Sequence, residues 1–186
     1  MLSRLSWSGR GIAPPDGKAR RKLHPLPIFS NLEDLLAQLR ERGAERPGLL
    51  ALDVSKRAIG VAGADAGWRL ATPLVTIRRQ RFAQDLEQLE RIIRERAAGA
   101  LVLGWPLNMD GSEGSRCQAV RAFAETLDAA LSLPILLWDE RLTTFAAEEA
   151  AERAGLRGRK RAEMLDALAA AAVLQDLLNA LGQRRI

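Results

Sequence analysis

The chain has 186 residues, of which 47% are hydrophobic, and a formal net charge of +5. Its single cysteine, Cys117, excludes an intramolecular disulfide framework and fits a reducing compartment, so we expect a cytoplasmic protein. A single histidine argues against a zinc site. The N-terminus lacks the apolar core of a secretory signal, and no apolar run approaches the ~20 residues of a membrane span, so no membrane partner is expected.

The excess positive charge lies at the N-terminus. Residues 1–22 carry six of the 28 Lys and Arg and one of the 23 acids, which leaves 22 of each sign in the rest of the chain. Segment 1–28 is rich in Gly and Pro, and we expect no packed structure there. It can be a solvated arm, a start codon assigned too early, or a basic arm that strengthens nucleic-acid binding, and charge alone leaves these open.

A helix is predicted over residues 31–42. Ser30 followed three residues later by Glu33 is typical of a capping box, and a leucine stripe then runs up to Gly43. We assign this helix to an N-terminal extension, residues 1–46, and expect it to dock on the exterior of a domain formed by residues 47–186.

Within that domain, three strands joined by hairpin turns precede an alternation of helices and strands. The expected strands are 48–54, 58–64, 68–77, 100–103 and 135–138. The expected helices are 82–93, 114–131, 143–154 and 161–181. This order predicts an α/β fold, with a mixed five-stranded sheet flanked by helices.

The first expected strand contains a carboxylate, Asp53, among apolar neighbours. A buried carboxylate is costly unless it meets a cation or an opening. Its hard oxygens suit Mg²⁺ or Mn²⁺. The alternative is a strand-end residue that caps its own turn through Ser55 or Lys56.

Two other places could supply further ligands. The strand 135–138 ends at Asp139 and Glu140, and because strand side chains alternate, only one of these can face the Asp53 site. The other can cap the next helix or pair with Arg141. Asp166 lies in the alanine-rich part of the last helix, where small neighbours permit close approach to the sheet, although it can also be a surface acid. Two strand acids and one helix acid predict a phosphodiester site with two ions about 4 Å apart.

Five segments, in this order, resemble the motifs of one protein family. They are DVSKRAIGVA (53–62), ATPL (71–74), GWPLNMDGSEG (104–114), DERLTT (139–144) and the helix around Asp166. The family is YqgF, also called RuvX, bacterial RNase-H-like proteins described as Holliday-junction-resolvase-like and as candidate pre-16S ribosomal RNA nucleases. The resemblance covers roughly residues 47–181.

The resemblance implies an RNase-H-like fold and a nuclease that depends on Mg²⁺ or Mn²⁺. It favours Asp53, Glu140 and Asp166 as catalytic residues and metal ligands, with Asp139 in a supporting catalytic role. Related nucleases often carry an acid at the end of the fourth strand, where this chain has none, so the acid after the fifth strand substitutes for it. Trp105 replaces a small aliphatic residue of the family; we expect it in the core, with stacking on a base as the alternative.

The signature loop and one cation beside the acids are candidate substrate contacts. The loop at Asn108 opens a helix, whose backbone N–H groups can bind phosphate. Arg141 can neutralise charge in the transition state or pair with Asp139.

Two basic segments are further candidates. Lys56 and Arg57 form the turn after Asp53. The run 157–161 precedes the helix that carries Asp166, and we expect its Arg159, Lys160 and Arg161 to contact phosphates rather than only solvent. No aromatic residues are interleaved with this run, so reading of base sequence is not implied.

Three functions follow. We favour hydrolysis of precursor ribosomal RNA during 5′-end processing of 16S RNA. The same chemistry would serve a resolvase acting on four-way DNA, which should be a homodimer because it cuts two strands symmetrically. A non-catalytic ribosome-biogenesis factor that binds nucleic acid is the third, and the set of three acids argues against it. The sequence leaves RNA or DNA, and monomer or homodimer, open.

Overall fold

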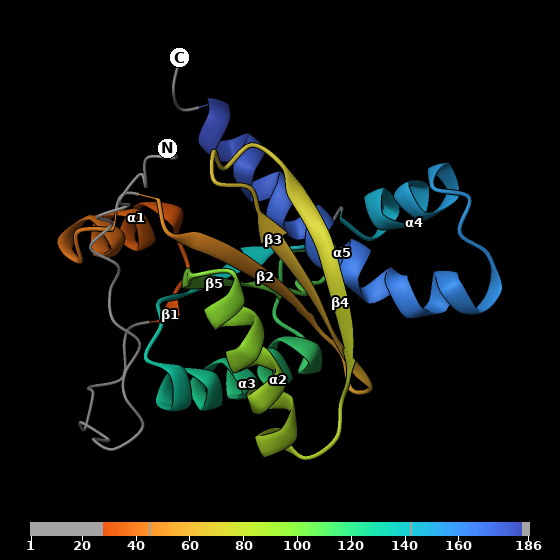
Figure 1. Cartoon of the computed structure of the whole chain (residues 1–186), viewed down its shortest axis with the longest axis horizontal. Coiled ribbons are helices and arrows are strands. Elements are labelled where there is room, and N and C mark those ends of the chain that lie inside the picture. The colour runs from red at the N-terminus through yellow and green to blue at the C-terminus, as the bar shows by residue number, and fades with distance from the viewer. Residues whose placement is uncertain (1–27, 45, 142, 184–186) are drawn as a thin grey trace, which may run out of the picture.

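The computed structural model describes residues 28–44, 46–141 and 143–183. They form a six-stranded sheet in the order β1-β6-β5-β2-β3-β4, with helices on both faces (Figure 1). The strands are β1 (Ile28–Phe29), β2 (Gly48–Val54), β3 (Ala58–Ala64), β4 (Ala71–Arg78), β5 (Ala98–Trp105) and β6 (Ile135–Asp139). The helices are α1 (Leu32–Glu41), α2 (Phe82–Glu95), α3 (Ser115–Leu131), α4 (Thr143–Arg153) and α5 (Gly158–Gln183).

Hairpins and crossovers give the sheet its mixed direction. β2, β3 and β4 pair antiparallel in sequence order, whereas β5 and β6 join the other side of β2 in parallel. The β2–β3 turn is held by Ser55, whose hydroxyl accepts a hydrogen bond from the Ala58 N–H at 3.0 Å and donates to the Ala58 carbonyl at 3.0 Å. The turn therefore closes directly after Asp53 and sets the register of the hairpin.

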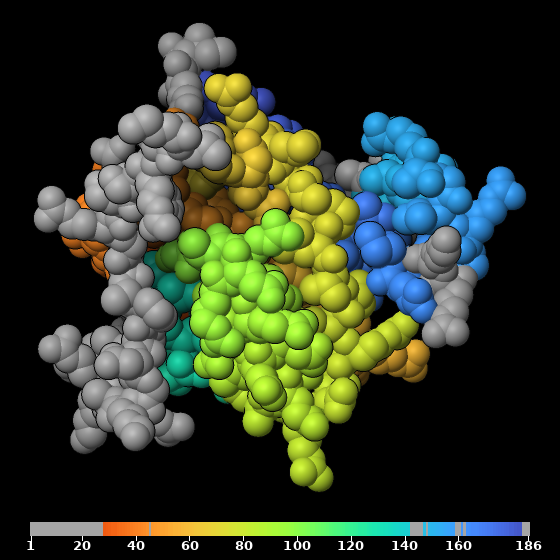
Figure 2. Space-filling view, viewed as in Figure 1, coloured from red at the N-terminus to blue at the C-terminus, as the bar shows by residue number. Residues whose placement is uncertain are grey.

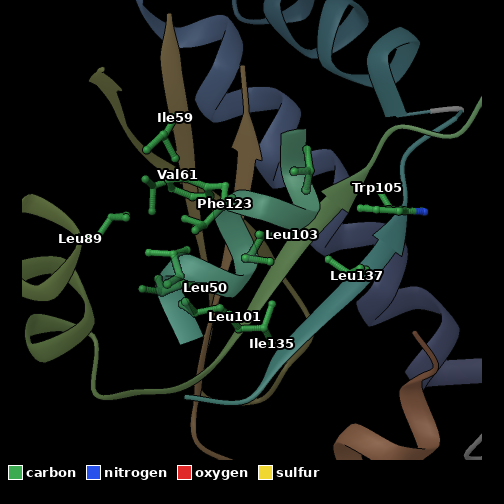
Figure 3. Close-up of a cluster of buried hydrophobic side chains, with 14 of the residues drawn as sticks. Leu50, Ile59, Val61, Leu89, Leu101, Leu103, Trp105, Phe123, Ile135 and Leu137 are labelled. Carbon is green, nitrogen blue, oxygen red and sulfur yellow. The ribbon is translucent and has the colours of Figure 1, made fainter. Parts of the chain in front are cut away.

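The two faces of the sheet bury separate clusters. On one face, α2 and α3 cover side chains such as Leu50, Leu103 and Ile135, together with Trp105 (Figure 3). Trp105 is 7% exposed, so it has the core-packing role expected from its sequence position. On the other face, α1 and α5 cover the alternate strand residues, including Ala51. In Figure 2, α2 and β4 lie side by side on the visible face, with α4 at one edge of the molecule.

Helix α5 is the longest element, and its apolar residues surround it. The segment Glu163–Gln183 is long and apolar enough to cross a membrane. The sequence analysis did not identify it, because polar residues interrupt its apolar runs. Core helices of globular domains share this property, and Leu174 and Leu177 are fully buried against the sheet. α5 also packs against β3 and β4, while α4 lies against its outer side (Figure 1). An apolar helix of this kind is typical of a core position.

One expectation about the sheet needs correction. The described residues form six strands rather than five, because Ile28 and Phe29 pair in parallel with β6; two residues are too few to show a period. The predicted helix is present as α1, and its Leu35 and Leu39 are buried in the same cluster as α5, so the leucine stripe packs against the domain. Most of segment 1–28 lies outside the described residues.

Candidate active site

Asp53 and Glu140 reach the α5 side of the sheet by strand alternation. In β2, Leu49 and Ala51 belong to the cluster under α5, so Asp53 points to the same side. In β6, Leu136 lies in that cluster, which directs Glu140 to this side as well. The Glu140 N–H donates to the Trp105 carbonyl at 3.2 Å and so continues the ladder with β5.

A glycine on the intervening strand makes room for Glu140. β5 lies between β2 and β6, and its Gly104 has no side chain where the Glu140 carboxylate lies. A Cβ at Gly104 would collide with Oε2 of Glu140. The carboxylate therefore lies across β5, on the side toward Asp53.

Asp166 is brought to the same place by close packing of α5. Gly60 pairs with Asp53 in the β2–β3 ladder. A Cβ at Gly60 would collide with the backbone carbonyl of Asp166, so the helix backbone rests directly on β3 at this point. The alanine-rich stretch around Asp166 permits this approach, as the sequence predicted.

The charges of these acids are coupled. Burial, together with the neighbouring charges of Glu140 and Asp166, raises the pKa of the Asp53 carboxyl to about 7, and the charge of Arg116 opposes this rise. Burial also raises the pKa of Glu140 against the effect of Arg116, and that of Asp166 against the effect of Arg78. A cation placed among these acids would relieve both the desolvation and the repulsion.

Asp53, Glu140 and Asp166 are neighbours, but their side chains are not arranged as a metal site in the described residues. Within residues 28–44, 46–141 and 143–183, no group of three His, Cys, Asp or Glu side chains is arranged to hold a metal ion. In this part of the structure the three acids do not form a ready-made ion site, and their role as shared metal ligands stays a prediction. Their chemistry still fits a divalent cation, because all three offer hard carboxylate oxygens.

Asp139 has a different partner. Its carboxylate accepts hydrogen bonds from Arg141 Nη2 at 2.7 Å and Nε at 2.9 Å, and from the Arg141 backbone N–H at 3.0 Å. These bonds lower the pKa of Asp139. Glu140 thus faces Asp53, while Asp139 binds Arg141. Strand alternation requires this, because the side chains of consecutive residues point to opposite faces of the sheet. Arg141 itself lies beside Gly111 of the signature loop.

The signature loop is closed by its own hydrogen bonds. The Asn108 side chain donates from Nδ2 to Oγ of Ser112 at 2.9 Å, and the Asn108 backbone N–H donates to the Ser112 carbonyl at 2.9 Å. The loop leads into α3 through Gly114, next to the acids. This geometry leaves the first N–H groups of α3 available at the site.

The other predicted substrate contacts lie in the turn between β2 and β3 and in the first turns of α5. Lys56 and Arg57 are exposed in the turn after Asp53. Arg161 is half-buried in the first turns of α5, the helix that carries Asp166. The side chains of Arg159 and Lys160 lie outside the described part of the structure. A groove of about 1400 Å³ is lined by Asp139 and Arg141, whereas Asp53, Glu140 and Asp166 are not among its lining residues.

Two arginines at the site were missed from the sequence. Arg116, in the first turn of α3, lies 3.5 Å from Oε1 of Glu140 through its Nη2 atom. Arg78, at the end of β4, is near enough to lower the pKa of Asp166. Arg116 could have been found, because it follows the signature loop directly at a helix start. Nothing in the sequence around Arg78 indicates its position.

The mixed sheet, flanked by helices and with three acids on one face, has the α/β fold and the set of acids that the sequence resemblance implied. The model of the RuvX family, described as Holliday junction resolvase, matches residues 48–180, and the chain belongs to this family. It is 47% identical over 154 residues to a protein of Cereibacter sphaeroides, with 83% of this chain and 94% of that protein covered. It is 49% identical over 138 residues to one of Rhodospirillum rubrum, with 74% and 86% covered. Both are named "Putative pre-16S rRNA nuclease".

A solved structure of T. thermophilus RuvC in complex with Holliday junction substrate also resembles the chain. The TM-score is 0.48 at 14% identity, with 74% of this chain and 96% of that chain covered. A likeness of that size adds nothing to the family assignment.

Proposed function

We propose that this protein is a divalent-cation-dependent nuclease that hydrolyses phosphodiester bonds in precursor 16S ribosomal RNA. The observation that carries the proposal is Asp53, a half-buried carboxylate with a pKa raised to about 7 and with Glu140 and Asp166 as its acidic neighbours. Removing such a carboxylate from water costs free energy unless a cation binds it. The RNA substrate is favoured by the name that the curated relatives carry.

Each residue has a part in this proposal. Asp53, Glu140 and Asp166 would hold Mg²⁺ or Mn²⁺, which when bound supplies an activated water and charge stabilisation at the phosphate. Asp139 fixes Arg141 beside the signature loop, where the guanidinium can face a phosphate oxygen. The start of α3 offers backbone N–H groups to the same anion.

Cleavage assays on two substrates test the proposal. Purified protein with Mg²⁺ or Mn²⁺ is incubated with a 16S precursor carrying its 5′ extension and, separately, with a four-way DNA junction. We expect cleavage of the RNA, and loss of cleavage by at least about 10³-fold in Asp53→Asn, which removes a charge but little volume. Glu90→Gln, an exposed acid of α2 paired with Arg94, is the matched control.

The outcomes separate the three functions. Cleavage of the junction alone, with a dimeric solution mass, would support the resolvase instead. Binding of RNA without cleavage under either metal would support a non-catalytic ribosome-biogenesis factor. An enzyme of ribosomal precursors would act in the cytoplasm, the compartment we propose, and a monomer would suffice for a single cut.

A further inference from the structure

Arg116 forms a weak ion pair with Glu140 that another cation can replace. Its Nη2 atom lies 3.5 Å from Oε1 of Glu140; the Arg116 side chain is 70% exposed, whereas that of Glu140 is 13% exposed. The carboxylate is thus held in place while the guanidinium extends over it from solvent. Because the two atoms are 3.5 Å apart and the Arg116 side chain is largely in solvent, the pair is weak, and another cation can displace the guanidinium.

The neighbouring arginines are held differently. Arg141 is bound to Asp139 through two side-chain nitrogens at 2.7 and 2.9 Å. Arg121, one and a half turns further along α3, pairs with Glu113 at 3.3 Å and stacks over the Trp105 ring at 4.9 Å. Neither of these arginines pairs with an acid that would hold a metal ion. Arg116 does, and its charge also reaches Asp53.

A divalent cation and Arg116 therefore compete for the same oxygen of Glu140. A guanidinium released from that oxygen stays at the start of α3, beside the acids that would hold the cation. Its planar fork of donors suits phosphate oxygens. The 70% exposure leaves the side chain room to turn there.

We propose that Arg116 exchanges partners during catalysis: it binds Glu140 before a divalent cation arrives, and a substrate phosphate after the cation has taken Glu140. This inference rests on the proposed function and assigns Arg116 as a substrate-binding residue that also moderates metal affinity. In this proposal Arg116 binds a phosphate only when a divalent cation is bound to Glu140.

The metal arm of the test uses Mn²⁺ alone and isothermal titration calorimetry. Arg116→Gln should bind Mn²⁺ about twofold to fivefold more tightly than wild type, because a weak competing cation is gone. Arg91→Gln is the matched control, since Arg91 is equally exposed on α2 and pairs with Glu95 in the same helix. It should leave the Mn²⁺ affinity unchanged. Equal or weaker Mn²⁺ binding by Arg116→Gln overturns the exchange.

The RNA arm compares binding of a short RNA in EDTA and in Ca²⁺, a hard cation suited to carboxylate oxygens. Wild type and Arg116→Gln should bind RNA equally in EDTA. In Ca²⁺, wild type should bind about threefold to tenfold more tightly, with a salt slope steeper by about one. Arg116→Lys should recover part of the difference, because it restores charge but not the fork.

The failures are distinguishable. If wild type binds RNA more tightly than Arg116→Gln by the same factor in EDTA and in Ca²⁺, Arg116 contacts phosphate whether or not a metal is bound. If the two proteins bind RNA equally under both conditions, Arg116 forms only a solvated surface pair. Either result overturns the exchange and leaves the nuclease proposal standing. If wild type binds no Mn²⁺ and cleaves neither substrate, the proposed function fails, and the exchange fails with it.

Discussion

The carboxylate of Glu140 lies against Gly104, in the space that a Cβ would occupy. Gly104 belongs to β5, the strand between the two that carry Asp53 and Glu140. The absence of a side chain there, rather than any contact, lets the two acids face one another across the sheet. Gly60 gives the same freedom to the backbone of Asp166.

Replacing Gly104 or Gly60 with alanine should change stability and Mn²⁺ affinity in different ways. Gly104→Ala meets the flexible end of a Glu140 side chain, which can turn away, so stability should fall by less than about 1 kcal/mol while Mn²⁺ affinity falls about tenfold or more. Gly60→Ala meets the backbone of Asp166 and Ala167, which cannot yield without moving α5. Stability should then fall by about 1–3 kcal/mol. Urea unfolding and Mn²⁺ titration measure both; equal stability losses would contradict this explanation.

The raised pKa of Asp53 predicts an unusual dependence of stability on pH in EDTA. Between its ordinary value of 3.8 and about 7, the folded protein holds a proton that the unfolded chain has lost. The free energy of unfolding should therefore fall as pH rises through this window, by an amount on the order of a few kcal/mol, and then level off.

Asp53→Asn isolates this effect. At pH 8 in EDTA the variant should melt about 5 °C or more above wild type, and at pH 4 the two should coincide. Mg²⁺ should narrow the gap at pH 8, because the cation binds the wild-type carboxylate. A melting difference that is the same at every pH would mean that Asp53 does not titrate in this window.

The basic run before Asp166 predicts a salt effect. Replacing Arg159, Lys160 and Arg161 with Gln should weaken RNA binding and reduce the slope of log affinity against log salt by about 0.7–0.9 for each phosphate that these side chains neutralise in the wild type. Filter binding over a range of KCl concentrations measures the slope. A second triple variant, Arg91, Arg94 and Arg96 to Gln, removes the same charge from α2. If both triples flatten the slope equally, the run acts only through net charge.

Much of the fold could be predicted because local patterns agree with tertiary packing. The hairpin of β2 and β3 follows from two apolar runs around the Ser55 turn, and the burial of α5 follows from its alanines and leucines. β1 could not be predicted, because its two residues become a strand only by pairing with β6. The burial of α1 also depends on a partner far along the chain, α5, which a local leucine stripe does not identify.

The site divides in the same way. Asp53, Glu140 and Asp166 could be proposed from acids set in apolar elements, and alternation along β6 explains why Glu140 rather than Asp139 faces Asp53. Arg116 could have been found from its place directly after the signature loop. Arg78 could not, since exposed arginines are common and only tertiary packing brings this one beside Asp166.

The N-terminal segment gives the last prediction. Residues 1–22 account for the net charge of +5, while the remainder of the chain is neutral. Deleting residues 1–27, and keeping Ile28 because it pairs with β6, should leave turnover at saturating substrate within about twofold of wild type. RNA affinity at low salt should fall, and the difference should vanish near 0.5 M KCl, where charges more than about 4–5 Å apart are screened. A full-length variant with the six Lys and Arg of this segment changed to Gln should behave like the deletion, which shows that charge rather than length matters. Loss of turnover at saturation in the deletion, but not in this variant, would instead place part of the segment in the active site.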